Sequence, residues 1–130
     1  MRDSPLAGVR VLLVDDDVLV RETLHEYFVE CGAVVVDADS ARAALAAFTT
    51  SPPDVLVSDL RMPPGEDGFW LIAAVRGRPP EAGGTVPAIA VSGDVLASAR
   101  AMEAGFQAVH GKPPNLPDLA GLVARLAGVP

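Results

Sequence analysis

The sequence VLLVDDD at residues 11–17 places three consecutive aspartates directly after a short apolar run. A second apolar run, DVLVSD at residues 54–59, also ends on an aspartate. Short β-branched runs of this kind predict buried strands, so each acid is expected where a strand passes into a loop. Open α/β sheets bind their ligands at that edge. The acids of the two segments are therefore predicted to converge on one site.

Apolar runs alternate with segments of helical periodicity along the chain. We expect strands at residues 9–14, 33–36, 54–58, 87–92 and 108–111. Helices are expected at residues 18–31, 41–48, 69–76, 95–104 and 116–127, with Asp17, Ser40 and Asn115 as N-caps. The Pro/Gly-rich stretch 77–84 is predicted to be a mobile surface connector. Strict alternation of this kind predicts an α/β fold in which helices cover both faces of a parallel sheet.

Composition limits what else the chain can do. Its 130 residues, 50% hydrophobic and 21% charged, predict one domain spanning residues 1–130. The formal net charge is −7, which repels phosphate backbones and anionic lipids, so neither nucleic acid nor a membrane is expected as a direct partner. The single Cys31 excludes an internal disulfide, and the sequence contains no secretory signal or membrane-spanning run. These features predict a cytoplasmic location.

Polar residues also follow the fourth and fifth predicted strands. Ser92 ends the fourth strand, and Lys112 follows the fifth. Asp15, Asp16 and Asp59 packed together without a counter-charge would repel one another and raise each other's pKa. A hard divalent cation relieves that repulsion, and Mg²⁺ prefers carboxylate, water and phosphate oxygens as ligands. The residues therefore predict a site for magnesium and a phosphoryl group.

The order and spacing of these motifs resemble the CheY-like receiver domain of two-component response regulators. The resemblance rests on VLLVDDD, on DVLVSDLRMPPGEDG at residues 54–68, on AVSG at residues 90–93 and on GKPP at residues 111–114. It covers about residues 9–126. It implies a flavodoxin-like (βα)5 fold, a doubly wound parallel sheet with strand order 2-1-3-4-5.

The resemblance also implies a metal site and its ligands. Asp59 would be both the phosphoacceptor and a metal ligand. Asp16 would bind Mg²⁺ directly, and Asp15 mainly through water. Arg61 would offer its backbone carbonyl to the metal. Mn²⁺ is the alternative ion, because it too favours oxygen ligands.

Phosphoryl binding and partners follow from the same resemblance. Ser92 and Lys112 would bind the phosphoryl oxygens, and the Lys112–Pro113 peptide bond would be cis. The implied donor is a histidine kinase or a histidine phosphotransfer domain. The output would pass to a protein partner or to a domain linked covalently in a parent chain, and the domain would not be an enzyme beyond its own phosphorylation and dephosphorylation. The sequences LAGVR at residues 6–10 and AGFQA at residues 104–108 are similar to those of receivers attached to hybrid histidine kinases.

Two other functions compete with this interpretation. A haloacid-dehalogenase-like phosphatase also uses a strand-end Asp, magnesium, a Ser/Thr and a Lys. That family places two acids with one residue between them, and Thr or Val two positions after the second. Asp15 and Asp17 match the acids here, but Leu19 occupies the Thr/Val position, and Asp118 alone follows Lys112 where an acid pair is required. The other alternative is a binding-only receiver that keeps the fold without phosphotransfer.

The sequence departs from the receiver pattern at two places. Val109 stands three residues before the Lys, where receivers usually carry Tyr or Phe as a switch residue. The loop MPPGEDG at residues 62–68 is one residue longer than the common form, which leaves open how its two acids approach the metal. The two histidines, His25 and His110, lack neighbours suited to metal binding or acid–base chemistry and are assigned no function.

Overall fold

Five parallel strands alternate with five helices in the computed structural model, which describes residues 4–129. The strands are β1 (Arg10–Val14), β2 (Val34–Ala38), β3 (Val55–Asp59), β4 (Ala88–Ser92) and β5 (Ala108–Gly111). The helices are α1 (Val18–Glu30), α2 (Ala41–Thr50), α3 (Gly68–Arg76), α4 (Val95–Ala104) and α5 (Leu116–Leu126). The strand order is β2-β1-β3-β4-β5 with parallel pairing throughout. The predicted flavodoxin-like topology is confirmed.

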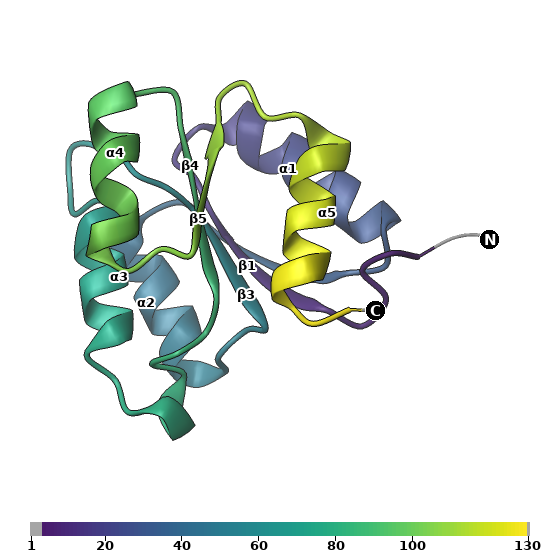
Figure 1. Cartoon of the computed structure of the whole chain (residues 1–130), viewed down its shortest axis with the longest axis horizontal. Coiled ribbons are helices and arrows are strands. Elements are labelled where there is room, and N and C mark those ends of the chain that lie inside the picture. Colours follow the sequence, from purple (N-terminus) through teal and green to yellow (C-terminus); the bar gives the residue numbers. More distant parts are fainter. Residues whose placement is uncertain (1–3, 130) are drawn as a thin grey trace.

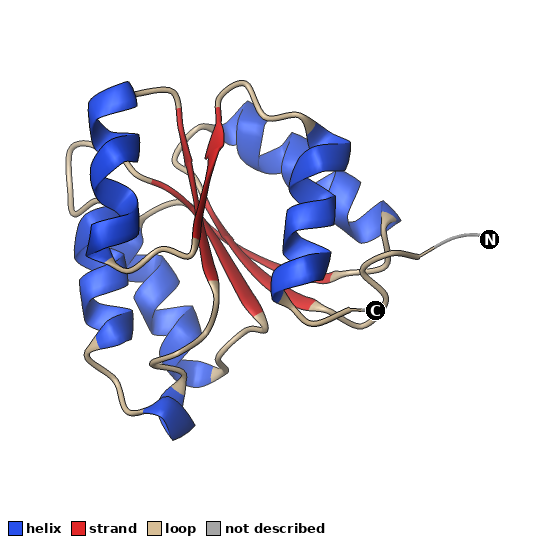
Figure 2. Ribbon diagram, in the orientation of Figure 1, coloured by secondary structure: helices blue, strands red, loops and turns tan. Residues whose placement is uncertain are grey.

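The helices form two layers, one on each face of the sheet. α1 and α5 cover one face, and α2, α3 and α4 cover the other (Figure 1). Figure 2 shows the strands as a single twisted layer between them. In β1, Val11 and Leu13 pack with α1 and α5, whereas Leu12 and Val14 pack with the other three helices. Burial on both faces explains why the central strands β1, β3 and β4 appear in the sequence as nearly continuous apolar runs.

Each of the five helices begins at a polar N-cap shortly after a strand. The capping side chains accept hydrogen bonds from backbone N–H groups of the first turn. The predicted caps Asp17, Ser40 and Asn115 are confirmed, and α3 and α4 use Asp67 and Asp94. Capped helix N-termini therefore surround the carboxyl edge of the sheet, where their dipoles favour negative charge.

The element boundaries differ from the prediction mainly at β2 and α2. β2 continues to Ala38 rather than ending at Val36, because its pairing with β1 extends through the polar Asp37. An exposed residue on an edge strand breaks the apolar pattern without breaking the ladder. α2 continues to Thr50, beyond the predicted end at Phe48. All other predicted strands and helices agree with the structure to within one residue at each end.

The connector at residues 77–84 is more ordered than the sequence indicated. It contains a short 3₁₀ helix at Pro80–Ala82. Arg78 Nε donates to the Ala82 carbonyl at 2.9 Å, and Arg76 Nη1 donates to the Gly84 carbonyl at 2.9 Å. These bonds tie the connector to the end of α3, so the segment predicted to be a mobile surface connector contains local structure.

Candidate metal and phosphoryl site

The carboxyl ends of neighbouring strands deliver the predicted site residues to one edge of the sheet. Asp59, at the end of β3, lies opposite Val91, one residue before Ser92. Ser92 lies opposite Gly111, one residue before Lys112. On the other side of β3, β1 ends immediately before the acid pair. The parallel register alone therefore brings together residues that are far apart in the sequence.

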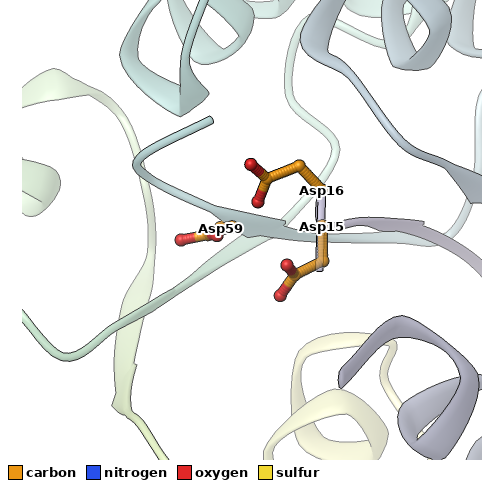
Figure 3. A group of neighbouring side chains, drawn as sticks. All are labelled: Asp15, Asp16 and Asp59. Atoms are coloured by element: carbon orange, nitrogen blue, oxygen red, sulfur yellow. The ribbon is translucent and has the colours of Figure 1, made fainter. Parts of the chain in front are cut away.

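Asp15, Asp16 and Asp59 form an acidic cluster in which each residue offers a carboxylate oxygen within 4.8 Å of the others. Asp15 and Asp59 are buried, and Asp16 is exposed. Figure 3 shows the first two leaving the end of β1 with Asp59 beside them. Within residues 4–129, this is the only group of three or more His, Cys, Asp or Glu residues placed to hold a metal ion. The predicted convergence of the two acid-bearing segments is confirmed.

The donor atoms of this cluster fit a hard divalent cation. All three are carboxylate oxygens, and no imidazole or thiol belongs to the group. Mg²⁺ characteristically takes one or two carboxylates and completes its octahedron with water and phosphate oxygens. The exposure of Asp16 leaves one side of the cluster open to such ligands. The residues therefore match an ion that binds phosphate and protein together.

Lys112 supplies the positive charge of the site. Its Nζ lies 3.1 Å from Asp15 Oδ2 and 3.1 Å from Asp59 Oδ2. The Lys112–Pro113 peptide bond is cis, the geometry that the resemblance implies. Burial alone would lower the pKa of the ammonium, but the hydrogen bonds to the two carboxylates and their charges raise it above its ordinary value. Lys112 therefore remains protonated and bridges the acids.

The Asp59 carboxyl is poorly stabilised as an anion. Burial raises its pKa above the ordinary value, and the charge of Asp15 raises it further. The hydrogen bonds from Lys112 and from the Arg61 N–H, the latter at 3.3 Å, offset only part of this effect. A carboxylate in this condition gains from any additional positive charge nearby. The site is thus electrostatically prepared for a cation.

Ser92 is buried at the same edge but faces its own loop. Its Oγ accepts a hydrogen bond from the Asp94 N–H at 3.0 Å. In the part of the chain that the structure describes, no hydrogen bond joins Ser92 to Asp59 or Lys112. The Asp94 carboxylate pairs with Arg61 Nη1 at 3.0 Å, which links the loop after β4 to the loop after β3.

The long loop after Asp59 keeps its two acids out of the acidic cluster. The Glu66 carboxylate accepts hydrogen bonds from Arg42 Nε and Nη2 at 2.8 and 3.0 Å. The same guanidinium lies over the ring of Trp70, 5.2 Å from its centroid. Asp67 accepts a hydrogen bond from the Trp70 N–H at 3.0 Å and caps α3. Neither acid approaches the metal position, which answers the question that the sequence left open.

Gly68 is a site residue that the sequence analysis did not identify. A Cβ atom at this position would lie 2.4 Å from the Asp59 carbonyl oxygen and 3.0 Å from the Leu60 Cα. Only glycine therefore lets α3 begin so close to the end of β3. Gly65, in the same loop, has nothing within 4 Å of its Cβ position. The sequence shows two loop glycines but not which one contacts the acceptor strand.

Val109 and the two histidines lie outside the acidic cluster. Val109 is half-buried in β5 and packs against the core under α2, α3 and α4. His25 Nδ1 lies 2.6 Å from Asp37 Oδ1, between α1 and β2. His110 Nε2 accepts a hydrogen bond from the Asn115 N–H at 3.1 Å. The position of the usual aromatic switch is thus filled by a packed aliphatic side chain.

Comparison with known sequences places the chain among signalling proteins. Residues 11–124 match the response regulator receiver domain family. An uncharacterized 14.6 kDa protein of Leptolyngbya boryana is 38% identical over 120 residues, which make up 91% of this chain and 89% of that protein. The chain spans about a quarter of the length of the NtrC transcriptional regulators that it matches.

The chain is also similar to receiver domains of known structure. The receiver domain of a signal transduction histidine kinase from Syntrophus aciditrophicus has a TM-score of 0.82 and 28% identity, covering 92% of this chain and 90% of that one. The receiver domain of the sensor histidine kinase PA1611 from Pseudomonas aeruginosa PAO1, determined with a magnesium ion in its active-site cleft, has a TM-score of 0.83 and 25% identity, covering 94% and 99%. No helix in residues 4–129 is long and apolar enough to cross a membrane. Sheet order, acidic cluster and family match agree, and the chain belongs to the response regulator receiver domain family.

Proposed function

We propose that Asp59 accepts a phosphoryl group from the phosphohistidine of a histidine kinase or a histidine phosphotransfer domain. The observation that carries the proposal is the position of Lys112 Nζ, 3.1 Å from Asp59 Oδ2 and beside the acidic cluster. An Asp59 oxygen attacks phosphorus, and the phosphorus–nitrogen bond to the donor imidazole breaks. The imidazole leaves with the bonding electrons, and an aspartyl phosphate remains. Positioning and electrostatics supply most of the catalysis in such transfers.

Asp15, Asp16 and Asp59, with the backbone carbonyl of Arg61, are the residues proposed to hold Mg²⁺, or Mn²⁺ in its place. We assign Asp16 and Asp59 to direct ligation and Asp15 to ligation mainly through water. When bound, the ion would supply positive charge to the phosphoryl oxygens. The raised pKa of Asp59 supports this assignment, because its carboxylate lacks sufficient positive charge in the protein alone.

Lys112 and Ser92 are proposed to bind the transferred group. Lys112 already pairs with the acceptor carboxylate, and its flexible stem allows the ammonium to follow the charge onto the phosphoryl oxygens. Ser92 Oγ accepts the hydrogen bond from the Asp94 N–H, so its own O–H can donate to a phosphoryl oxygen while that bond is kept. Movement of Ser92 toward the phosphoryl group would then pull the loop after β4 toward the acceptor.

The output is proposed to pass to a protein partner or to a domain linked in a parent chain. Support comes from the NtrC transcriptional regulators, because this chain spans about a quarter of their length. Phosphohistidine donors act in the cytoplasm, and we place the domain there. We propose no enzymatic activity beyond phosphorylation and dephosphorylation of Asp59 itself.

The phosphatase alternative is weakened by the position of its second acid. In that reading Asp17 would be the acid–base residue. Its Oδ1 instead accepts hydrogen bonds from the Leu19 and Val20 N–H groups at 2.9 and 3.2 Å, and it caps α1. This capping directs the Asp17 side chain to the N-terminus of α1, and Asp17 is absent from the acidic cluster.

The test is the intact mass of the protein after incubation with magnesium and acetyl phosphate, beside the Asp59→Asn variant. We expect the parent to gain one phosphoryl group and the variant to gain none. Omission of magnesium should abolish the gain. If the parent mass stays unchanged and beryllofluoride also fails to bind, the binding-only alternative replaces this proposal.

A further inference from the structure

A guanidinium lies directly behind the acid pair. Arg21, on the first turn of α1, donates a hydrogen bond from Nη1 to the backbone carbonyl of Asp15 at 2.8 Å. Its side chain is only 17% exposed. Within residues 4–129, it forms no ion pair with a carboxylate of the acidic cluster. Arg21 therefore contacts the backbone of the turn at residues 15–17 and does not pair with the carboxylates of the acidic cluster.

Arg21 is held in place from its other side. Its Nε lies 3.8 Å from Asp37 Oδ2 in β2. The second oxygen of Asp37 lies 2.6 Å from the Nδ1 of His25, which follows Arg21 by four residues on α1. One strand residue and one turn of helix thus fix the position of the guanidinium.

The Asp15 carbonyl, which accepts the hydrogen bond from Arg21, belongs to the peptide unit that joins Asp15 to the exposed Asp16. Asp15 is fixed by other bonds as well: its N–H donates to a carbonyl of β2, its Oδ1 accepts from the Asp17 N–H at 2.9 Å, and its Oδ2 pairs with Lys112. Asp16 is exposed, so its direction depends on the backbone that carries it. Because a peptide unit is planar, fixing the Asp15 carbonyl also fixes the Asp16 nitrogen.

We propose that Arg21 is a positioning residue for the metal. By holding the peptide unit between Asp15 and Asp16, it aims the Asp16 carboxylate and raises the affinity for Mg²⁺. The inference rests on the proposed function, since it takes Mg²⁺ as the ion that is held. Charge alone predicts the opposite sign, because a guanidinium near a cation site repels the cation and its removal would tighten binding. The direction of the change therefore separates the two effects.

The experiment is a titration of the metal-free protein with magnesium chloride at constant ionic strength, followed by the amide NMR signals of residues 15–17 and 59–61. Arg21→Met removes the donor and keeps most of the apolar stem. We expect its Kd for Mg²⁺ to rise about 10-fold, the effect typical of residues that orient metal ligands. Arg21→Lys keeps the charge without the guanidinium geometry and should raise the Kd by a smaller factor.

Arg125→Met is the matched control. It removes the same charge from an exposed position in the last turn of α5, at the end of the helix remote from the site, and should leave the Kd unchanged. A second measurement follows phosphorylation by acetyl phosphate. In Arg21→Met the magnesium concentration for half-maximal rate should rise, while the rate at saturating magnesium should stay that of the parent.

Each outcome has a defined meaning. A Kd in Arg21→Met equal to or below that of the parent overturns the role of Arg21, while the metal site itself stands. Absence of saturable magnesium shifts in the parent overturns the metal site and this inference with it. If Arg21→Met does not fold, Arg21→Lys decides: a higher Kd supports the positioning role, and a Kd equal to that of the parent rejects it.

Discussion

The two loops that supply the acids of the site are held in different ways. The turn after β1 is short, and Asp15 is fixed by Lys112, by the Asp17 N–H, by Arg21 and by β2. The loop after β3 is long. Leu60 and Met62 at its start are buried in the core, and its outer part is held by ion pairs whose arginines, Arg42 and Arg61, are 71% and 70% exposed. Exposed pairs of this kind contribute little stability.

This difference assigns separate tasks to the two loops. The turn after β1 is preorganised, as a metal ligand must be to bind tightly without first being ordered. We expect the loop after β3 and the loop after β4, joined through Arg61 and Asp94, to rearrange when the charge on Asp59 changes. We call the turn at residues 15–17 the metal half of the site and the loops after β3 and β4 its phosphoryl half. The two halves meet at Asp59. The following experiments, from the largest expected effect to the smallest, test that division.

The largest effect is expected where the adaptable loop meets the rigid sheet. In Gly68→Ala, the new methyl group would lie 2.4 Å from the Asp59 carbonyl oxygen, so α3 or the end of β3 must shift. We expect the free energy of unfolding in urea to fall by about 1–3 kcal/mol. Phosphorylation by acetyl phosphate should slow as well. Gly65→Ala, in the same loop with open space around it, is the control, and equal losses in both variants would contradict the contact described.

The next effect concerns the metal half. Because a ligand that binds only the folded state stabilises it, magnesium should raise the melting temperature of the parent. Asp16→Asn should remove most of that increase, and it should raise the melting temperature without metal by relieving repulsion. Glu66→Gln removes the same charge from the adaptable loop and should respond to magnesium as the parent does. A parent-like magnesium response in Asp16→Asn would show that Asp16 is not a ligand.

A smaller effect depends on pH. The folded state raises the pKa of Asp59, so the fold disfavours its ionised form. The contribution of Asp59 to stability is therefore greatest below its unfolded-state pKa and is lost as pH rises through the folded-state value. In chelator, Asp59→Asn should be more stable than the parent at neutral pH, and the difference should shrink toward acid pH. Urea unfolding across this range is the measurement, and a difference that grows on acidification would reverse the assigned sign.

The smallest effects are those expected remote from the acceptor. Val109 is a stiff β-branched residue without a ring to move between two positions. In a comparison of amide NMR spectra of free and beryllofluoride-bound protein, we expect large shifts at residues 59–68 and 92–96 and modest ones at Val109 and in α5. Shifts of similar size throughout β5 and α5 would mean that those elements switch without an aromatic residue.

The sequence predicted those features that depend on local pattern. VLLVDDD and DVLVSD identify their strands and the acids that follow, because burial on both faces demands unbroken apolar runs. The bounds of α4 and β5 were also predicted correctly, and Gly105 closes α4 as the sequence indicated. The position of the cation followed from Lys112 and the parallel topology together. These inferences needed no knowledge of how helices pack on one another.

The remaining features depend on distant pairs that no local pattern reveals. The sequence shows Glu66 only as one of two acids in its loop. The structure shows that Arg42, 24 positions earlier, binds its carboxylate outside the acidic cluster. Gly68 matters because the end of β3 passes beside its Cα. Arg21 looks like an ordinary helix residue, since its target is a backbone oxygen rather than a side chain. The roles of these three residues become visible only from their tertiary placement.

The stacking of Arg42 on Trp70 links the intrinsic fluorescence of the protein to the loop after β3. Trp70 is the only tryptophan in the chain, so its emission arises from one environment. The guanidinium over its face is the same group that tethers Glu66, and a cation is held there by the quadrupole of the ring. Release of the loop after β3 would free that guanidinium and change the environment of the indole. We therefore expect the fluorescence of the unlabelled protein to change when the loop beside the acceptor moves.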